Sequence, residues 1–375
     1  MTDSMMTVPE DNRAMVSNHL FDSNSFDAHE RVISVFDEKS GLKAIIALHS
    51  TRLGPAAGGT RMYPYATAED AFRDVLRLSR GMSYKNAMAG LPLGGGKAVI
   101  IGDPKTDKSE AALRAFGRAV NELAGRYYTA EDMNISVHDI ETIAQETAYV
   151  AGRENSPAPS GDPSPVTARG IYLGIKTCLQ QKFGSDDLAG RKIAVLGIGK
   201  VGGALARHLA AEGAELIIAD TNLDVLAQMK HETGARVSTI GGIFDEECDV
   251  FSPNAVGGIL DDMTVERIKA PIIAGGANNQ LSVTAIGQRI HDRGILYAPD
   301  YVINGGGIIN VYAEIRVLQG KAESYDKDWV EKKLQKMNAN LAHVLARAED
   351  EGRPTHDVAD EEARAIIAGT SALVV

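Results

Sequence analysis

Apolar residues in the first third of the chain follow two different spacings. Residues 29–50 and 97–101 contain short β-branched runs, which predict strands, the first two joined by a turn at residues 39–41. Residues 67–87 carry apolar side chains every three or four positions, which predicts a helix with Thr67 as its N-cap. The same helical spacing returns after Ser109 and over residues 136–152. We therefore expect a first region that mixes strands and helices.

Beyond residue 167, strands and helices alternate regularly. Residues 168–181 predict a helix, and the apolar run before Gly197 predicts a strand. Further short apolar runs, each followed by a turn or helical segment, occupy residues 214–220, 235–239, 248–254, 271–278 and 294–300. This alternation is typical of a doubly wound parallel sheet. A charged segment of helical period follows from about residue 326.

A change of composition separates these two regions. Residues 152–167 hold four of the 13 prolines, which predicts a linker, and we expect residues 156–165 to act as a hinge. The chain is long enough for two domains. We predict an α/β protein with a first domain at residues 1–152, a second at 153–345, and a C-terminal helix at 346–375 that joins the first domain. The polar first ~25 residues are expected to be poorly ordered or to form an oligomer arm.

Charge and cysteine content exclude several classes of protein. The net charge of −11 argues against binding to nucleic acid or to an anionic membrane. Cys178 and Cys248 are the two cysteines and form no CxxC pair, and the nine histidines form no HxxH pair, so no metal site is expected. We find no signal peptide and no apolar run near the ~20 residues of a membrane span. These features suit the reducing cytoplasm.

A glycine-rich turn follows the first strand of the second domain. Gly197, Gly199 and Gly202 have the GxGxxG spacing, with an apolar strand before them and a helical pattern after them. Such a turn brings the backbone and a helix N-terminus to a pyrophosphate. Asp220 ends the next strand, where a carboxylate would accept hydrogen bonds from the adenosine ribose and repel a 2′-phosphate. The pattern therefore predicts a dinucleotide site that prefers NAD to NADP.

A second glycine-rich segment, Gly90 to Ile101 or "GLPLGGGKAVII", calls for a different explanation. A phosphate-binding P-loop would need glycine where Leu91 stands, a hydroxyl residue in place of Ala98, and a helix where this segment predicts a strand. An NTP-binding function is therefore excluded. Two hypotheses remain for this segment: a structural turn, or a catalytic Lys97 held in a bare pocket whose approach the three glycines would leave clear.

Several neighbouring motifs resemble one family. They are "GGTRMYPYATAEDAFRDVLRLSRGMSYKNAMAGLPLGGGKAVIIGDP", "YYTAED", "SGDPSPVTARG", "GIGKVGG", "GGANNQL" and "APDYVINGGGIINV". The chain resembles the leucine, valine and phenylalanine dehydrogenases, relatives of glutamate dehydrogenase, over roughly residues 30 to 345. The resemblance implies a substrate-binding and oligomerisation domain, a Rossmann domain that binds NAD, and an active site in the cleft between them. It also implies reversible oxidative deamination of an L-amino acid to a 2-oxo acid and ammonia by a homo-oligomer, from dimer to octamer.

The resemblance assigns roles to individual residues. Lys85 matches the lysine that holds the substrate carboxylate, with help from Gly58 and Gly59. Lys97 matches the catalytic lysine that assists the attack of water on an iminium, and burial beside Lys85 would ease loss of its proton. Asp132 matches the acid that exchanges protons with the substrate nitrogen. On the cofactor side the matching residues are Thr167, Lys200, Val201, Asn254, Ala255, Asn278, Asn279 and Asn304, of which Asn278 also faces the substrate.

The same resemblance outlines the pocket for the substrate side chain. Its expected lining is Ala57, Met82, Ala130, Ala151, Ile308 and Val311. None is charged, so a glutamate side chain would be buried without a cation. Ala57 and Ala151 leave room for an aromatic side chain, whereas Ile308 takes space away. We expect leucine, valine or isoleucine as substrate, with phenylalanine and tryptophan close behind. The alternatives are a dehydrogenase of this fold for glutamate or another substrate, and a non-catalytic NAD-binding regulator.

Overall fold

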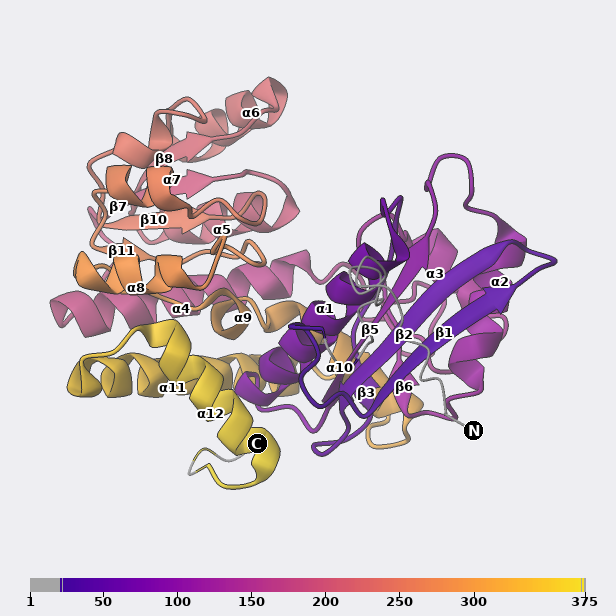
Figure 1. The fold of residues 1–375 in the computed structure, drawn as a ribbon. Coiled ribbons are helices and arrows are strands. Elements are labelled where there is room, and N and C mark those ends of the chain that lie inside the picture. Colours follow the sequence, from indigo (N-terminus) through magenta and orange to yellow (C-terminus); the bar gives the residue numbers. More distant parts are fainter. Residues whose placement is uncertain (1–20, 22, 372, 374–375) are drawn as a thin grey trace, which may run out of the picture.

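The computed structural model describes residues 21, 23–371 and 373, so the prediction for the first ~25 residues falls largely outside it. Two α/β units lie side by side (Figure 1), each built around its own sheet. The first sheet carries the earlier part of the chain, and the second carries residues 192–297. The fold predicted from the alternation of strands and helices is confirmed.

The first sheet has the strand order β1-β2-β5-β3-β6, and β4 also pairs with β5. Its strands are β1 (Arg31–Asp37), β2 (Leu42–Ser50), β3 (Ala56–Ala57), β4 (Thr60–Tyr63), β5 (Gly94–Ile101) and β6 (Tyr127–Tyr128). Alternate residues of β2 and β5 face opposite sides, and both sides are buried. One side packs against α1 (Ala68–Met88), and the other against α2 (Glu110–Asn121) and α3 (Val137–Ile143).

The three glycines before Lys97 belong to β5 itself, which begins three residues earlier than predicted. A Cβ atom at Gly94 would lie 1.9 Å from the Ser50 carbonyl oxygen, and one at Gly95 would lie 2.1 Å from the Ser83 nitrogen. At Gly96 it would lie 2.7 Å from the Tyr127 ring. The expectation that these glycines clear the approach to Lys97 is therefore corrected. They let β5 pack closely against β2, α1 and β6, which fixes the strand that carries the lysine.

The second sheet is entirely parallel, with the strand order β12-β11-β10-β7-β8-β9. Its strands are β7 (Lys192–Leu196), β8 (Glu215–Ala219), β9 (Arg236–Val237), β10 (Val250–Pro253), β11 (Ile272–Ile273) and β12 (Leu296–Tyr297). Its helices are α4 (Ser164–Phe183), α5 (Lys200–Ala211), α6 (Leu223–Thr233), η3 (Ile243–Asp245), α7 (Asp262–Arg267) and α8 (Ala285–Asp292). The order reverses between β7 and β10, and ligands of doubly wound sheets bind at such a point.

The chain then returns to the first domain through four helices. These are α9 (Asp300–Ile303), α10 (Gly306–Leu318), α11 (Lys327–Glu351) and α12 (Thr355–Ala368). The predicted single helix at 346–375 is instead the end of α11, a break at residues 352–354, and α12. Gly352 ends α11 in the left-handed conformation, with a φ of +63°, and Pro354 precedes the first residue of α12. Helix α12 packs against α1, and Arg364 Nε donates to the Tyr84 hydroxyl at 2.7 Å.

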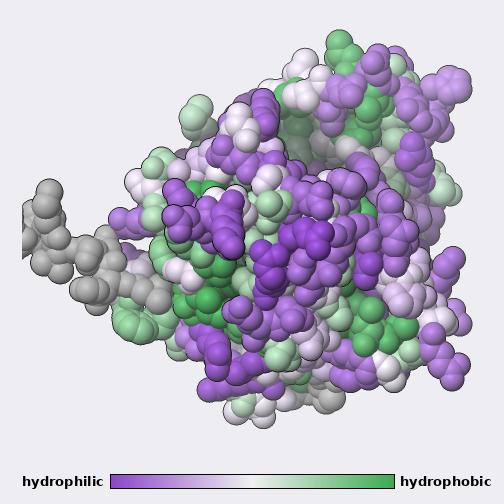
Figure 2. Space-filling view, turned by 90° about the vertical axis from the view of Figure 1, so that its right-hand side faces the viewer, coloured by the Kyte–Doolittle hydropathy of each residue, from purple (hydrophilic) through white to green (hydrophobic). Residues whose placement is uncertain are grey.

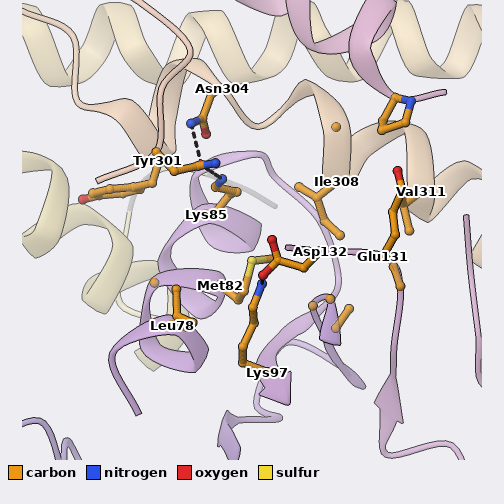
Figure 3. Close-up of a pocket in the computed structure, with 18 of the residues that line it drawn as sticks. Leu78, Met82, Lys85, Lys97, Glu131, Asp132, Tyr301, Asn304, Ile308 and Val311 are labelled. Carbon is orange, nitrogen blue, oxygen red and sulfur yellow. Dashed lines mark hydrogen bonds and ion pairs between the residues drawn. The ribbon is translucent and has the colours of Figure 1, made fainter. Parts of the chain in front are cut away.

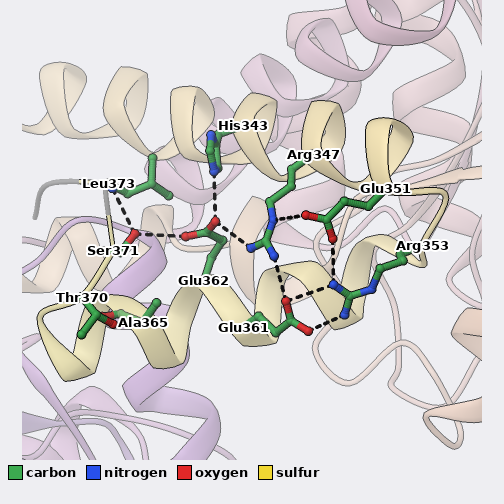
Figure 4. Close-up of polar contacts among 10 residues, drawn as sticks. All are labelled: His343, Arg347, Glu351, Arg353, Glu361, Glu362, Ala365, Thr370, Ser371 and Leu373. Carbon is green, nitrogen blue, oxygen red and sulfur yellow. Dashed lines mark hydrogen bonds and ion pairs between the residues drawn. The ribbon is translucent and has the colours of Figure 1, made fainter.

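An ion-pair network holds α12 on α11 (Figure 4). Glu362 accepts from Arg347 Nη1 at 2.9 Å, contacts His343 Nε2 at 3.0 Å, and accepts from Ser371 at 3.0 Å. Arg347 also pairs with Glu351 and Glu361. Several of these groups are partly buried, and together they tie α12 to α11.

Two predicted helices have different limits in the structure. Helix α3 ends at Ile143, because Val150 forms a parallel bridge with Thr129 and the preceding residues turn to reach it. Helix α4 begins at Ser164, inside the proline-rich stretch, because Pro165 occupies its first turn, where proline is tolerated. The division of the chain at residue 152 and the hinge at 156–165 stay predictions.

Candidate active site

A cavity of about 530 Å³ lies between the two domains. Strands β3 and β5, helix α1 and the loop after β6 line it from the first domain. Helix α4, the loop after β11, and helices α9 and α10 line it from the other side (Figure 3). Most residues predicted for substrate and chemistry meet here: Ala57, Gly58, Gly59, Met82, Lys85, Lys97, Ala130, Asp132, Thr167, Val201, Asn278, Asn279, Asn304, Ile308 and Val311.

Lys97 and Asp132 form an ion pair at the centre of this cavity. Lys97 Nζ lies 2.7 Å from Asp132 Oδ2, and the lysine side chain is 8% exposed. Figure 3 shows the two side chains pointing at each other from β5 and from the loop after β6. Burial alone would raise the pKa of Asp132, but the positive charges of Lys97 and Arg61 outweigh it and lower the pKa to about 2. Asp132 is therefore a carboxylate at neutral pH.

Lys85 reaches across the cleft from α1. Its Nζ donates to Asn278 Oδ1 at 3.0 Å, and Asn304 Nδ2 donates to the same oxygen at 2.9 Å (Figure 3). Burial, helped by the positive charge of Lys97, lowers the pKa of Lys85 to about 8 against the attraction of Asp300 and Asp132. Lys85 uses one of its N–H donors on the Asn278 amide, and the remaining donors of this cation are suited to a carboxylate ligand.

Five of the six residues predicted to form the side-chain pocket line the cavity. They are Ala57, Met82, Ala130, Ile308 and Val311, and none carries a charge. Ala151 is the exception, because it is fully buried in the core behind the cavity, beside Ala57 and Tyr128. Tyr128 and Ile315 line the cavity without having been predicted.

The glycine-rich turn has the geometry that a dinucleotide requires. Gly197 has a φ of +92°, and a Cβ at Gly202 would lie 1.9 Å from the Gly197 carbonyl oxygen. A Cβ at Gly199 would meet no atom of the described chain, so the space above the turn is open. No side chain caps the N-terminus of α5, which leaves its backbone N–H groups for an anion. These residues fit a bound NAD.

The other predicted cofactor residues surround this turn. Asp220 follows β8, and its carboxylate accepts from the Ile198 nitrogen at 2.6 Å and the Asn222 nitrogen at 2.9 Å. Asn254 and Ala255 follow β10, and Ala255 packs against Gly197. Lys200 is solvent-exposed and pairs with Asp162 at 3.1 Å. All lie at the carboxyl ends of parallel strands or at the start of α5, where ligands of this fold bind.

The residues predicted to lie beside the nicotinamide line the same cavity as the predicted substrate residues. Thr167 is in the first turn of α4, and Asn279 adopts a φ of +51° in the loop after β11. Asn304 is nearly buried between α9 and α10, and its Oδ1 has no hydrogen-bond partner among the described residues. An unpaired buried acceptor is costly and is consistent with a polar ligand group at this position.

Sequence reasoning missed several charged groups in this cavity, and three of them lie near Asp132 or Lys85. Arg61 pairs with both Asp132 and Asp74, Asp300 lies close to Lys85, and Glu131 faces the cavity beside Asp132. Glu131 stands next to the predicted Asp132 in "TAED", and Arg61 lies two residues after the predicted Gly59 in "GGTR". Their partners come from distant parts of the chain, so local spacing gave no sign of the contacts.

Among the described residues, no group of three or more His, Cys, Asp or Glu side chains could hold a metal ion. The described helices include none that is long and apolar enough to cross a membrane.

A Rossmann sheet with an open dinucleotide turn, facing a buried lysine–aspartate pair, defines a dehydrogenase that uses a nicotinamide cofactor. Residues 29–153 match the family model described as "Glu/Leu/Phe/Val dehydrogenase, dimerisation domain", and residues 218–372 match "Glutamate/Leucine/Phenylalanine/Valine dehydrogenase". Leucine dehydrogenase of Geobacillus stearothermophilus is 50% identical over 89% of each chain. The chain belongs to this family, is an amino-acid dehydrogenase, and uses NAD.

Two further relatives are similar over nearly the whole chain. Valine dehydrogenase of Streptomyces virginiae is 45% identical and covers 92% of this chain and 95% of its own. The crystal structure of L-tryptophan dehydrogenase from Nostoc punctiforme superposes with a TM-score of 0.81 at 41% identity. It covers 92% of this chain and 97% of its own.

Proposed function

We propose that this enzyme catalyses the reversible, NAD-dependent oxidative deamination of an apolar L-amino acid to its 2-oxo acid and ammonia. Leucine, valine and isoleucine are the first candidate substrates, with phenylalanine and tryptophan next. The observation that carries the proposal is the buried Lys97–Asp132 pair beside a pocket of uncharged side chains. Relatives at similar identity are named for leucine, valine and tryptophan, which supports an apolar substrate without selecting one.

Lys85 and Asn278 would hold the substrate carboxylate at the start of the reaction. The hydrogen bond between Lys85 and Asn278 spans the cleft, so a carboxylate that binds Lys85 would also lie beside the Asn278 amide on the opposite wall. Gly58 and Gly59 also line the cavity. A larger residue does not fit at position 58, since a Cβ at Gly58 would lie 2.0 Å from the Gly96 carbonyl oxygen. The substrate side chain would then lie among Ala57, Met82, Ala130, Ile308 and Val311.

Asp132 and Lys97 would handle the protons. NAD, when bound, supplies the acceptor for the hydride that leaves Cα. Asp132 takes a proton from the substrate ammonium group, so that the nitrogen lone pair can form the iminium. Lys97 then accepts a proton from the water that attacks the iminium carbon, and as an ammonium group it stabilises the oxygen of the carbinolamine. Asp132 returns its proton to the carbinolamine nitrogen, the C–N bond breaks, and the departing ammonia takes the hydroxyl proton as the carbonyl group forms. The proton on Lys97 then passes to solvent.

A glutamate substrate is the second candidate, and the pocket disfavours it. A γ-carboxylate among the five apolar lining residues would be desolvated without a cation. A non-catalytic regulator is disfavoured because Lys97 and Asp132 are both present and in contact.

We further propose that the enzyme is a homo-oligomer assembled through its first domain. The family model for residues 29–153 is described as a dimerisation domain. Strand β1 is an edge strand on which Phe36 is 69% exposed, and the face in Figure 2 shows hydrophobic patches among hydrophilic residues.

Closure of the cleft about residues 156–165 would complete the site, and solution scattering with NAD and a substrate analogue should show compaction.

The catalytic roles are tested by Lys97→Ala and Asp132→Asn. Each variant should lose at least ~10³-fold in kcat with L-leucine while still binding NADH, measured by fluorescence titration. Lys333→Ala is a matched control, since Lys333 is also partly buried but donates to the Gly90 carbonyl oxygen outside the cavity. Full turnover by Lys97→Ala would disprove the mechanism.

A further inference from the structure

Arg61 is a charged group of the cavity to which the proposed mechanism gives no role. It lies on β4, and its side chain is only 18% exposed. Arg61 Nε donates to Asp132 Oδ2 at 3.3 Å, and Nη1 donates to Asp74 Oδ2 at 3.1 Å. The Tyr65 hydroxyl donates to the same Asp74 oxygen at 2.7 Å. The guanidinium group is therefore fixed at two ends, between an acid of α1 and the acid of the active site.

We propose that Arg61 is a positioning residue that keeps Asp132 ionised and fixed by Oδ2 while Lys97 changes its protonation state during turnover. The proposal rests on the proposed function, because it assumes that Lys97 and Asp132 exchange protons with water and substrate. It adds a residue that holds the acid without touching the substrate.

The need for such a residue follows from the chemistry of the pair. When Lys97 becomes a neutral base, Asp132 loses the positive charge that stands 2.7 Å from its oxygen. A carboxylate in a partly dry cavity without a cation is driven to take up a proton. It would then be unable to accept the next proton from the substrate. A guanidinium group stays charged at every working pH, so Arg61 supplies the charge that Lys97 gives up.

The other groups around Asp132 do not supply a constant positive charge. The charged and titratable groups that face it are Lys97, Arg61, Lys85, Glu131, Tyr65 and Tyr127. Glu131 is acidic, and the two tyrosines are neutral. Lys85 has a pKa of about 8 and loses its proton in alkaline solution. Arg61 is the cation of this set whose charge does not depend on pH.

The contacts also orient the carboxylate. Lys97 and Arg61 make their closest contacts with the same oxygen, Oδ2. Oδ1 is then the oxygen presented to the substrate nitrogen. Only a planar fork can bridge Asp132 and Asp74 in this way, because a lysine ammonium at the same position is a single point charge.

The test compares Arg61→Gln and Arg61→Lys with Arg73→Gln. Arg73 is a matched control because it is 56% exposed, pairs with Asp70, and lies outside the central cavity. We expect Arg61→Gln to lower kcat for L-leucine about 100-fold, as expected for a misplaced catalytic group. The acid limb of its kcat/KM profile should move up by about one pH unit or more, because loss of a fixed positive charge makes the Lys97–Asp132 pair take up a proton more readily. KM for NAD should not change.

Arg61→Lys separates charge from geometry. It should keep the wild-type acid limb and still lose about tenfold in kcat, whereas Arg73→Gln should match the wild type in both. Wild-type kcat in either Arg61 variant would overturn the proposal. A lower kcat with an unmoved acid limb in Arg61→Gln would indicate a purely structural role and would also overturn it. If Arg61→Gln does not fold, as judged by circular dichroism, the kcat of Arg61→Lys decides.

Asp132→Asn distinguishes this proposal from the one on which it rests. If Asp132→Asn turns over normally, the proposed proton exchange is wrong, and the role of Arg61 fails with it. If Asp132→Asn is inactive while Arg61→Gln behaves as wild type, only the inference about Arg61 fails.

Discussion

The position of Lys85 predicts how carboxylate binding depends on pH. Burial lowers the pKa of its ammonium group from the usual 10.5 to about 8. The carboxylate ligand binds the charged form, so affinity is complete below that pKa and is lost as pH rises through it. With a pKa of about 8, roughly a tenth of the enzyme carries the charge at about pH 9 and roughly a hundredth at about pH 10.

These fractions convert directly into affinity. The inhibition constant of a carboxylate ligand should rise about tenfold by about pH 9 and about 100-fold by about pH 10, or roughly 1.4 and 2.7 kcal/mol. The probe is 4-methylpentanoate, which resembles L-leucine but lacks its amine. Its carboxyl group stays ionised throughout, because carboxyl groups ionise near about pH 4. The assay measures competition with L-leucine at saturating NAD between about pH 6 and about pH 10.

Lys85→Arg is the matched variant for this experiment. A guanidinium group keeps its charge over the whole range, so inhibition by 4-methylpentanoate should be weaker but independent of pH. A constant inhibition constant for the wild type up to about pH 10 would refute the reasoning. An equal alkaline rise in Lys85→Arg would assign the effect to another group.

Three further predictions concern packing, stability and selectivity. Gly95→Ala should lower the free energy of unfolding by about 3 kcal/mol, because its Cβ would lie 2.1 Å from the Ser83 nitrogen, whereas Gly199→Ala should leave the melting temperature unchanged and weaken NADH binding at least tenfold. Glu362→Gln should lower the free energy of unfolding by about 1–2 kcal/mol in urea titrations at neutral pH. Burial opposes ionisation of Glu362, but its bonds with His343, Arg347 and Ser371 outweigh burial and lower its pKa. This stabilisation is therefore present above the usual 4.5 and is lost as pH falls through the lowered pKa of Glu362. The stabilities of the two proteins should converge in acid, and a constant difference would contradict the assignment. Ala57→Leu should reduce kcat/KM for L-phenylalanine relative to L-leucine about tenfold, because Ala57 lines the pocket; an unchanged ratio would place the aromatic side chain elsewhere.

The second domain could be predicted well from sequence because its signals are local. Each buried strand is a short apolar run that ends in a turn, and the glycines, the strand before them and Asp220 all lie within one βαβ unit. The alternation of strands and helices is enough to predict the parallel sheet. The point at which the strand order reverses predicts the edge of the sheet where a ligand binds. Resemblance then supplied Lys85, Lys97 and Asp132, which lie far apart in sequence and meet in the cavity.

The rest depends on contacts between distant segments. Residues 144–151 have helical spacing, yet the bridge between Val150 and Thr129 draws them out of a helix. The glycines before Lys97 suggest an open approach from sequence, although the backbone of Ser50 and Ser83 explains them. Arg61 has no partner nearby in sequence, because its two acids lie 13 and 71 residues away. Ala151 has the expected size, but its position behind the cavity follows only from packing.

The central claim is that this dehydrogenase acts on an apolar amino acid through a pocket without charge. Its most direct test is the ratio of kcat/KM for L-leucine to that for L-glutamate, measured as initial rates of NADH formation by the wild-type enzyme. We predict a ratio of at least ~10³, because burying an unpaired carboxylate costs several kcal/mol. A ratio near or below one, with NAD still bound, would contradict the account of the pocket.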